Sequence, residues 1–471
     1  MRERIEEESV LFVSVIKWLV LATITGAIVG AATTVFLKAL EWGVELGGRH
    51  EYTFLLLPVA FFLSAYIIEK LAPEAEGHGT EKVIEAVHHR SGKIDAPVVP
   101  VKLVATVVTI AAGGSAGKEG PCAQIGAGLS SLFADLFKFN DVDRKKLVIC
   151  GISAGFSTVF GTPIAGAIFG IEVLFIGTLL YDVLLPSFIA GIVGFQVSSA
   201  LGVHYFYNLM DSIPGLDSFF LAKVLLSGLF FGLCSFLHVE LLNLGKSISS
   251  RLPLSKPVKG LVGGAAVAAL VFVFSRDYLG LGVHTIEAVL LGEPVPWYSS
   301  FAKGLFTSIT LNFGGSGGIV TPTFFVGATS GSFFADIMGF DRATFAAIGL
   351  AALVAGAANT PIAASIMAVE LFGSKLAPYA ATACVVSFFI CGHRSVYPSQ
   401  ILALKKSASL QVELGREIER IRPAYQQRSR SVTGVIGKAA TLVRDRLKRR
   451  AAIERGAAER KPPAKKGRPR Q

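Results

Sequence analysis

The sequence predicts an all-α polytopic membrane protein with two related halves and many tilted or broken helices. Low charge, long uncharged stretches and an internal repeat predict it. Of 471 residues, 52% are hydrophobic and 17% are charged, whereas soluble proteins carry about 25% charged residues. Several uncharged stretches approach or exceed the roughly 20 residues that a spanning helix needs. They are 18–37, 103–117, 183–209, 304–335, 343–369 and 376–392.

The first and longest of these stretches need separate comment. MRERIEEES precedes stretch 18–37 with no small-residue cleavage site, so a retained span is expected rather than a signal peptide. Stretch 54–68 is short for a span. Stretch 304–335 is 32 residues long and rich in glycine, so it is expected to be broken. Irregular backbone at membrane depth is tolerated only where it is buried or lines a cavity.

The positive charge is concentrated at the C-terminus. Residues 416–471 hold 18 Lys/Arg and 5 Asp/Glu, a net charge of +13, which leaves about −2 of the total +11 for the rest of the chain. By the positive-inside rule, this arrangement predicts a cytoplasmic C-terminus in a multi-pass protein of the cell membrane. The chain therefore divides into a membrane domain, 1–408, and a basic tail, 409–471, that is expected to be partly disordered.

Two glycine-rich segments about 200 residues apart repeat each other. Residues 113–135 read GGSAGKEGPCAQIGAGLSSLFAD, and residues 314–336 read GGSGGIVTPTFFVGATSGSFFAD. A second pair agrees in order and spacing, since 150–173 and 348–371 each contain a TPIA turn and then a glutamate, Glu172 or Glu370. This pattern indicates duplicated halves, about 10–202 and 220–408. Glycine-broken segments at matching places in an apolar chain point to a transporter and its binding site.

The loops of the repeat are suited to anion binding. Both Gly113–Gly120 and Gly314–Gly318 run into apolar helices, and a helix start offers free N–H groups and partial positive charge. A third such loop, Gly77–Thr80, precedes a helix expected from Glu81. Two opposed helix starts could hold a small dehydrated anion without a buried lysine or arginine. The first copy carries Lys118 and Glu119 where the second carries Ile319 and Val320.

Motifs in this order resemble the CLC family of chloride channels and proton-coupled anion exchangers. GKEGP (117–121) is similar to its GxEGP signature, PEAEGHGTE (73–81) to its first anion loop, GGIVTP (317–322) to its GGIFAP loop, and SVYPSQIL (395–402) to its final tyrosine helix. The resemblance implies the CLC fold with inverted halves, and a homodimer with one pore in each subunit. The helices carrying Glu172 and Glu370 are then candidates for the dimer interface.

The resemblance implies a role for each matching residue. Glu119 is the gating glutamate, whose carboxylate competes with the anion, and Tyr397 is the coordinating tyrosine. His78 stands where most members have serine and can titrate near neutral pH, while Glu81 replaces a proline. The implied anion-binding residues are His78, Gly79, Gly117, Lys118, Glu119, Gly318, Ile319, Val320 and Tyr397.

The proton route departs from the exchanger pattern. Exchangers usually carry two consecutive glutamates after the TPIA turn, whereas this chain has Glu172 and Val173. The main expectation is therefore a glutamate-gated, channel-like or weakly proton-coupled pathway for small inorganic anions, most of all chloride. The alternative is a fluoride/proton or chloride/proton antiporter. TPTFFVGATSG (321–331) resembles the fluoride-exporting branch, although Ile319 and GKEGP depart from it.

Other functions are expected to be absent. The sequence shows no nucleophile–base set and no HExxH motif, so no enzymatic activity is expected, and no cofactor beyond the transported ion. His88 and His89 lack companions at metal-binding spacing, so no metal site is expected. The expected partners are a second copy of the chain and the lipid bilayer, including anionic headgroups that attract the basic tail. Nucleic-acid binding is not expected, because the tail is almost free of aromatic residues.

Overall fold

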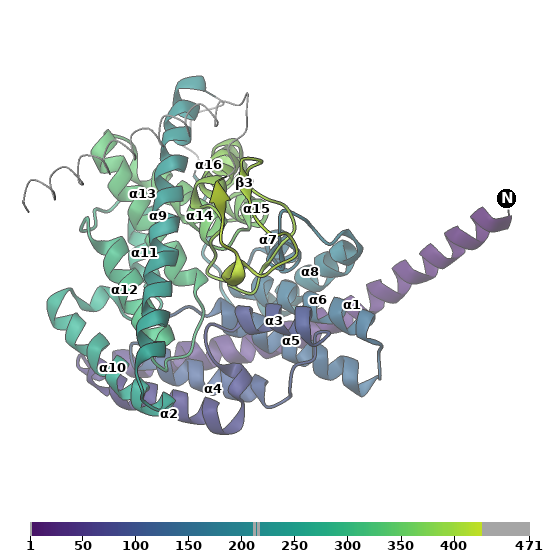
Figure 1. The fold of residues 1–471 in the computed structure, drawn as a ribbon, viewed down its shortest axis with the longest axis horizontal. Coiled ribbons are helices and arrows are strands. Elements are labelled where there is room, and N and C mark those ends of the chain that lie inside the picture. Colours follow the sequence, from purple (N-terminus) through teal and green to yellow (C-terminus); the bar gives the residue numbers. More distant parts are fainter. Residues whose placement is uncertain (1, 211–212, 214–216, 426–471) are drawn as a thin grey trace, which may run out of the picture. The chain divides into compact units, whose positions relative to one another are not determined.

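The computed structural model describes residues 2–210, 213 and 217–425, with side chains from Glu6 onward. Most of the basic tail therefore lies outside the described residues. The chain divides into two compact units. The first comprises Met1–Leu404 and Leu414–Arg420, and the second comprises Lys405–Glu413 and Ile421–Gln471. The first unit contains all the α-helices described below (Figure 1).

Sixteen α-helices are present in the described part of the chain. The first eight are α1 (Arg2–Gly48), α2 (Leu57–Leu71), α3 (Thr80–His89), α4 (Val98–Ala111), α5 (Glu119–Leu136), α6 (Asp141–Phe160), α7 (Pro163–Glu172) and α8 (Leu184–Ala200). The others are α9 (Ser218–Arg251), α10 (Lys256–Val273), α11 (Val283–Leu290), α12 (Ser299–Asn312), α13 (Val320–Met338), α14 (Arg342–Ala357), α15 (Pro361–Phe372) and α16 (Ala377–Cys391).

Short elements complete the fold. The 3₁₀ helices are η1 (Thr53–Leu56), η2 (Pro73–Ala75), η3 (Tyr181–Val183), η4 (Arg276–Tyr278), η5 (Ser374–Leu376) and η6 (Ile418–Arg420). The parallel pair β1 (Phe175–Ile176) and β2 (Ile401–Leu402) joins the segment after α7 to the segment after α16. The antiparallel pair β3 (Leu410–Gln411) and β4 (Ala424–Tyr425) belongs to the second unit.

The helices confirm the prediction of a polytopic, all-α membrane protein. Six helical stretches in the described residues are long and apolar enough to cross a membrane. They are 6–48, 53–71, 181–200, 218–251, 256–273 and 374–391. The 34-residue helix α9 was missed by the search for uncharged stretches, because Lys223 and Glu240 interrupt it. The first turns of α1 extend away from the other helices of the first unit (Figure 1).

Glycine and proline break the apolar stretches at matching places. Stretch 304–335 is divided between α12 and α13 by the loop 313–319, as its glycine content predicted. Gly113 and Gly314 end their helices with the same φ of 103°, which a residue with a side chain rarely adopts. Pro163 and Pro361 begin α7 and α15, where a missing N–H costs no helical hydrogen bond. The breaks expose helix starts inside the fold.

Candidate anion site

The two glycine-rich loops of the repeat lie against each other at the starts of α5 and α13. The Gly117 N–H donates to the Gly318 carbonyl at 2.8 Å, and the Gly318 N–H donates to the Gly117 carbonyl at 2.6 Å. These reciprocal bonds bring together residues that match in the repeat. They also occupy both amides, so neither Gly117 nor Gly318 has an N–H free for an anion in this conformation.

Hydroxyl groups of α4 and α12, the helices that precede the two loops, also form matching hydrogen bonds between the copies. Thr109 Oγ1 accepts from the Ser316 N–H at 3.0 Å, and Thr310 Oγ1 accepts from the Ser115 N–H at 3.1 Å. The Ser316 hydroxyl pairs with Thr106, and the Ser115 hydroxyl pairs with Thr307. Each contact from the helix of one copy to the loop of the other is therefore made a second time with the two copies exchanged. Such reciprocal contacts are the mark of two parts related by a two-fold axis. An approximate two-fold axis thus relates the two loops.

Glu119 breaks this symmetry. Its Oε1 accepts from the Val320 N–H at 2.5 Å, and its Oε2 accepts from the Thr321 hydroxyl at 2.7 Å. The side chain is almost completely buried, with 1% of its surface exposed. The carboxylate of the first copy therefore occupies the N-terminus of α13 in the second copy, where backbone N–H groups and the helix dipole favour a negative charge.

Space for the carboxylate depends on two glycines. A β-carbon added at Gly117 would lie 2.3 Å from Glu119 Oε2, and one added at Gly318 would lie 2.1 Å from Oε1. Any side chain at either position would therefore displace the carboxylate. This close approach gives a physical reason for glycine at both matched positions.

His78 and Tyr397 lie next to each other near Glu119. Their ring centroids are 5.6 Å apart. Tyr397 is fully buried, and within the described residues its hydroxyl makes no hydrogen bond of normal geometry, although Thr80 is close by. The Nδ1 atom of His78 is also buried without a partner. Two donors without partners, beside a carboxylate that a small anion can replace, suit an anion site.

The backbone of the first anion loop is held in a tight position. Gly79 has a φ of 83°, and a β-carbon there would lie 2.5 Å from the Gly120 carbonyl oxygen. Lys102 is fully buried and donates to the carbonyls of Ala75 at 3.1 Å and Gly77 at 2.6 Å. Lys102 was not among the residues singled out from the sequence, and its ammonium group fixes the backbone of this loop through two carbonyls.

The protonation of His78 also differs from the expectation. Its loop lies outside the membrane-spanning helices, and burial lowers the pKa of His78 to about 3, with the positive charge of Lys102 adding to the effect. Because the imidazole is then neutral at physiological pH, it does not titrate near neutrality as the sequence led us to expect.

The remaining predicted residues have other surroundings. Lys118 precedes α5, and its partly buried side chain lies near Glu41 and Glu119. Ile319 is buried at the start of α13, and its carbonyl accepts from the Thr323 N–H. Ile319 therefore contributes backbone and apolar surface next to the carboxylate of Glu119.

Glu172 and Val173 lie apart from Glu119. The Glu172 carboxylate accepts from the N–H groups of Ile362 and Ala363 at 3.0 and 2.8 Å. Glu370 accepts at the same distances from those of Ile164 and Ala165. Each glutamate of the second repeat pair thus caps the helix of the other half. Val173 is fully buried, and its carbonyl accepts from the side-chain amide of Gln400.

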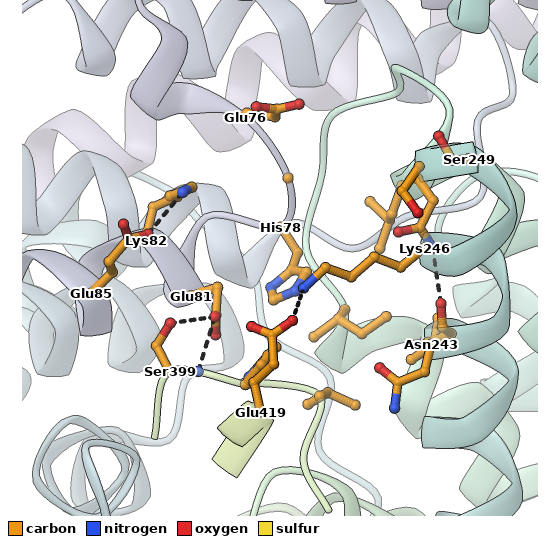
Figure 2. A pocket seen from close by; sticks show the side chains of 18 of the residues that line it. Glu76, His78, Glu81, Lys82, Glu85, Asn243, Lys246, Ser249, Ser399 and Glu419 are labelled. Atoms are coloured by element: carbon orange, nitrogen blue, oxygen red, sulfur yellow. Dashed lines mark hydrogen bonds and ion pairs between the residues drawn. The ribbon is translucent and has the colours of Figure 1, made fainter. Parts of the chain in front are cut away.

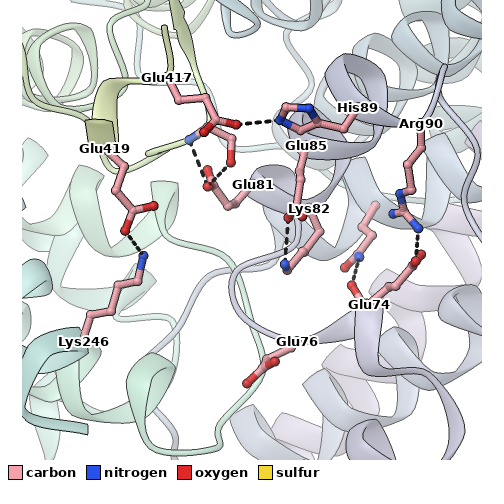
Figure 3. Close-up of polar contacts among 12 residues, drawn as sticks. Glu74, Glu76, Glu81, Lys82, Glu85, His89, Arg90, Lys246, Glu417 and Glu419 are labelled. Atoms are coloured by element: carbon pink, nitrogen blue, oxygen red, sulfur yellow. Dashed lines mark hydrogen bonds and ion pairs between the residues drawn. The ribbon is translucent and has the colours of Figure 1, made fainter. Parts of the chain in front are cut away.

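A cavity of about 760 Å³ opens beside the site. His78, Glu81, Ile319 and Ser399 form part of its wall (Figure 2). Ion pairs join charged residues of its wall. They join His89 to Glu417, Lys246 to Glu419, Lys82 to Glu85 and Lys256 to Glu76. Figure 3 shows those of Glu85, Glu417 and Glu419.

Sequence reasoning missed several residues of the site. Thr321 supplies a hydroxyl to Glu119, yet the sequence suggested only backbone contacts from this loop. Thr106, Thr109, Thr307 and Thr310 hold the two loops together. These threonines match across the repeat with the same spacing of 201 residues as Ser115 and Ser316. Extending the repeat alignment toward the N-terminus would have found them.

Comparisons with known proteins identify the relatives of the chain. Residues 60–392 match the family described as "Voltage gated chloride channel". The chain is 34% identical over 391 residues to the "Chloride/fluoride channel protein" of Pseudomonas syringae pv. tomato, covering 82% of this chain and 86% of that protein. It is 27% identical over 384 residues to an uncharacterized protein of Methanocaldococcus jannaschii, covering 80% and 94%.

Solved structures share the fold. A CLC-type fluoride/proton antiporter matches with a TM-score of 0.78 and 29% identity, covering 82% of this chain and 98% of that chain. A slow cyanobacterial Cl⁻/H⁺ antiporter matches with a TM-score of 0.69 and 21% identity, covering 79% and 94%. The expected fold, with two repeated halves, agrees with both.

Proposed function

This chain belongs to the CLC family of anion channels and transporters, and from that premise we propose that it exchanges fluoride for protons across a membrane. Transport of small anions follows from the family. The coupling to protons and the choice of fluoride are the parts that we propose. The observation that carries the proposal is the Glu119 carboxylate bound at the start of α13.

The proposed mechanism follows from competition for one position. A charged Glu119 accepts from the Val320 N–H and the Thr321 hydroxyl. Protonation removes its negative charge and weakens both hydrogen bonds, because bonds to an ionised acceptor are about twice as strong as neutral ones. The neutral side chain then leaves, and an anion takes its place beside Tyr397 and His78. Anion and proton thus occupy the site in a linked cycle, which is the requirement for exchange.

Two relatives support the choice of anion. The names of the Pseudomonas protein and of the structural neighbour at 29% identity both include fluoride. Fluoride is small and strongly hydrated, so it needs several compact donors in place of its water. The Val320 N–H, which Glu119 occupies in this structure, and the Tyr397 hydroxyl are such donors. These features favour the antiporter over the chloride-selective, channel-like pathway that the sequence led us to expect.

Chloride is the second candidate, as the substrate of a chloride/proton antiporter. The observation that favours it is the apolar wall beside the site, where Ile319 is buried at the start of α13. A larger and more weakly hydrated anion tolerates such a wall better than fluoride does. Chloride is therefore the natural competitor in any measurement of transport.

Orientation and assembly are also proposed. Glu417, Glu419 and Arg420 line the cavity, and the basic segment begins at Arg416. The positive-inside rule then assigns the cavity to the cytoplasmic side. We further propose a homodimer that forms through α7, α8, α15 and α16. Exposed apolar side chains on these helices, such as Ile192, Ile362 and Phe389, are consistent with a buried contact in a dimer.

Transport by purified protein in liposomes tests the proposal. Liposomes loaded with potassium fluoride or potassium chloride are diluted into medium of low halide, with valinomycin to clamp the voltage. External pH and halide are recorded together. We expect outward fluoride flow to drive protons inward against their gradient, and fluoride to exceed chloride by about tenfold, the change that 1.4 kcal/mol of discrimination produces. Halide flow without proton movement would support a channel, and a preference for chloride would support the second candidate.

A further inference from the structure

This chain departs from the usual family sequence at two positions of the first anion loop. It departs at a third position directly after Glu172, where exchangers usually carry a glutamate that accepts protons. His78 and Glu81 replace the usual serine and proline, and Val173 replaces the usual second glutamate. Val173 is fully buried and does not line the cavity described above. An exchanger built on this chain therefore needs another group to receive protons on the cavity side. Glu81 is a carboxylate on that side.

The geometry of Glu81 suits a proton acceptor. Its Oε1 accepts from the Ser399 N–H at 3.0 Å and from the Ser399 hydroxyl at 2.5 Å (Figure 2). Its Oε2 is buried and has no hydrogen-bond partner among the described residues. One oxygen is thus fixed by donors, and the other is open to a proton. The residue is only partly buried and lines the cavity, so protons from the aqueous side can reach it.

Glu81 differs from the other acids of the cavity wall. Glu76, Glu85, Glu417 and Glu419 form ion pairs with Lys256, Lys82, Arg420 and Lys246, respectively. Figure 3 shows the pairs of Glu85 and Glu419. Glu81 forms no ion pair within the described part of the chain. An acid without a cationic partner keeps a higher affinity for protons than a paired acid does.

The charged and titratable groups around Glu81 come from several elements. Helix α3 contributes Lys82 and Glu85, α9 contributes Lys246, the preceding loop contributes His78, and the loop before β2 contributes Tyr397. Helix α3 is not one of the membrane-spanning helices. Burial raises the pKa of Glu81 to about 7, while the Ser399 hydrogen bonds and the charges of Lys246 and Lys82 act in the opposite direction. At neutral pH the group can therefore both take up and release a proton.

Glu81 also lies next to the anion site. Both Glu81 and Glu119 are close enough to the Tyr397 hydroxyl for their charges to act on it. Tyr397 is two residues before Ser399, the residue that holds Glu81. His78, in contact with the Tyr397 ring, also lines the cavity. These groups form a short layer between the cavity and Glu119.

From this placement we propose that Glu81 is the cavity-side proton acceptor of the exchanger and passes protons toward Glu119 through the layer of His78 and Tyr397. The proposal rests on the function proposed above. In the first step an O–H bond forms at Glu81 Oε2 as one breaks in a hydronium ion of the cavity. In the second step the O–H bond at Glu81 breaks as an N–H bond forms at one ring nitrogen of neutral His78. The N–H bond at the other ring nitrogen breaks as the Tyr397 hydroxyl oxygen takes up that proton and releases its own. The proton finally forms an O–H bond at Glu119, whose neutral carboxyl leaves α13.

The test compares Glu81→Gln with Glu85→Gln in the liposome assay of the full chain. Glutamine keeps an oxygen that can accept from Ser399 but cannot take up a proton. Glu85 is on the same helix and in the same cavity, and it is already paired with Lys82. We expect Glu81→Gln to lower the number of protons moved per fluoride by about a hundredfold, the lower range for loss of a proton-transfer group. Glu85→Gln should leave that ratio unchanged, and Glu81→Asp should restore part of it.

Each outcome is decisive. A wild-type ratio of protons to fluoride in Glu81→Gln would overturn the proposal while leaving the exchange function intact. Altered halide affinity with an unchanged ratio would show that Glu81 only anchors the Ser399 loop, and would also overturn it. If Glu81→Gln does not fold, the ratio measured for Glu81→Ala decides, since a wild-type ratio without the carboxyl group contradicts a titrating role. Absence of proton movement in the wild type would reject the exchange function, and this proposal with it.

Discussion

The loops before α5 and α13 have nearly the same sequence and the same backbone, but different chemistry. Both place a glycine with a φ of 103° at the end of the preceding helix, and both form the reciprocal bonds between Gly117 and Gly318. Two positions after these glycines, the first copy has Glu119 and the second has Val320. The acid of one copy consequently binds the free amide of the other.

This comparison shows how a duplicated fold acquires one function from two equal parts. Two helix starts with equal partial charges would form two equal anion sites. Because only one copy carries an acid, the copies become a gate and a receptor for that gate. The next matched positions, Gly120 and Thr321, also differ between the two copies. Gly120 has no room for a side chain beside the His78 carbonyl, whereas Thr321 has room and uses its hydroxyl to bind Glu119.

The largest expected effect comes from removing the acid that distinguishes the copies. In Glu119→Gln the side chain keeps its shape but loses its negative charge and its titration. We expect fluoride flux to become independent of pH and proton movement to fall by about a hundredfold or more. Stopped-flow halide efflux at several pH values, recorded together with external pH, checks this. Glu45→Gln, on the exposed face of α1, is the control. Flux that keeps the wild-type pH dependence in Glu119→Gln would contradict the gating role.

A smaller effect tests whether the matched glycines serve the carboxylate. All three atoms nearest to a β-carbon at Gly117 belong to the Glu119 carboxylate, whereas one at Gly318 would also approach the Gly120 backbone. Gly117→Ala is therefore expected to lower stability by about 2 kcal/mol, as overpacking of a buried site does. Most of this loss should disappear in the background of Glu119→Ala.

A double-mutant cycle with thermal unfolding in detergent measures this coupling. Gly318→Ala serves as the comparison, and less of its loss should be recovered in the same background. Equal losses for Gly117→Ala with and without the Glu119 side chain would show that this glycine serves the backbone alone.

The repeat explains how much of the fold and site could be predicted from sequence. Glycine and proline restrict the backbone locally, so the broken stretch 304–335 and the facing loops could be predicted without coordinates. The repeat itself identified Glu119 as the residue in which the copies differ. These features depend on residue type and spacing, which the sequence states directly.

Contacts between the halves could not be predicted in this way. The partners of Glu172 and Glu370 lie about 190 and 206 residues away along the chain, and nothing local specifies them. Lys102 seemed unremarkable within an apolar stretch, but tertiary packing places its amine on two carbonyls of the anion loop. Helix α9 was missed because a few charged residues interrupt it, although its neighbours in the fold accommodate them. Tertiary packing between segments far apart in the chain decides all of these.

The smallest expected effect concerns Thr321, whose side chain, in the part of the chain that the structure describes, donates to the carboxylate of Glu119 from the second copy. Thr321→Val keeps the shape of the side chain and removes the hydroxyl donor to the carboxylate. The loss of one hydrogen bond to a charged group weakens the bound position of Glu119 by about 1 kcal/mol after partial compensation by the Val320 N–H. Because Glu119 and the anion compete, the anion should then bind about fivefold more tightly at neutral pH. Isothermal titration with fluoride measures this change. Thr323→Val, whose hydroxyl bonds only within the first turns of α13 and to His238, is the matched control. Weaker fluoride binding in Thr321→Val would show instead that the hydroxyl serves the anion more than the gate.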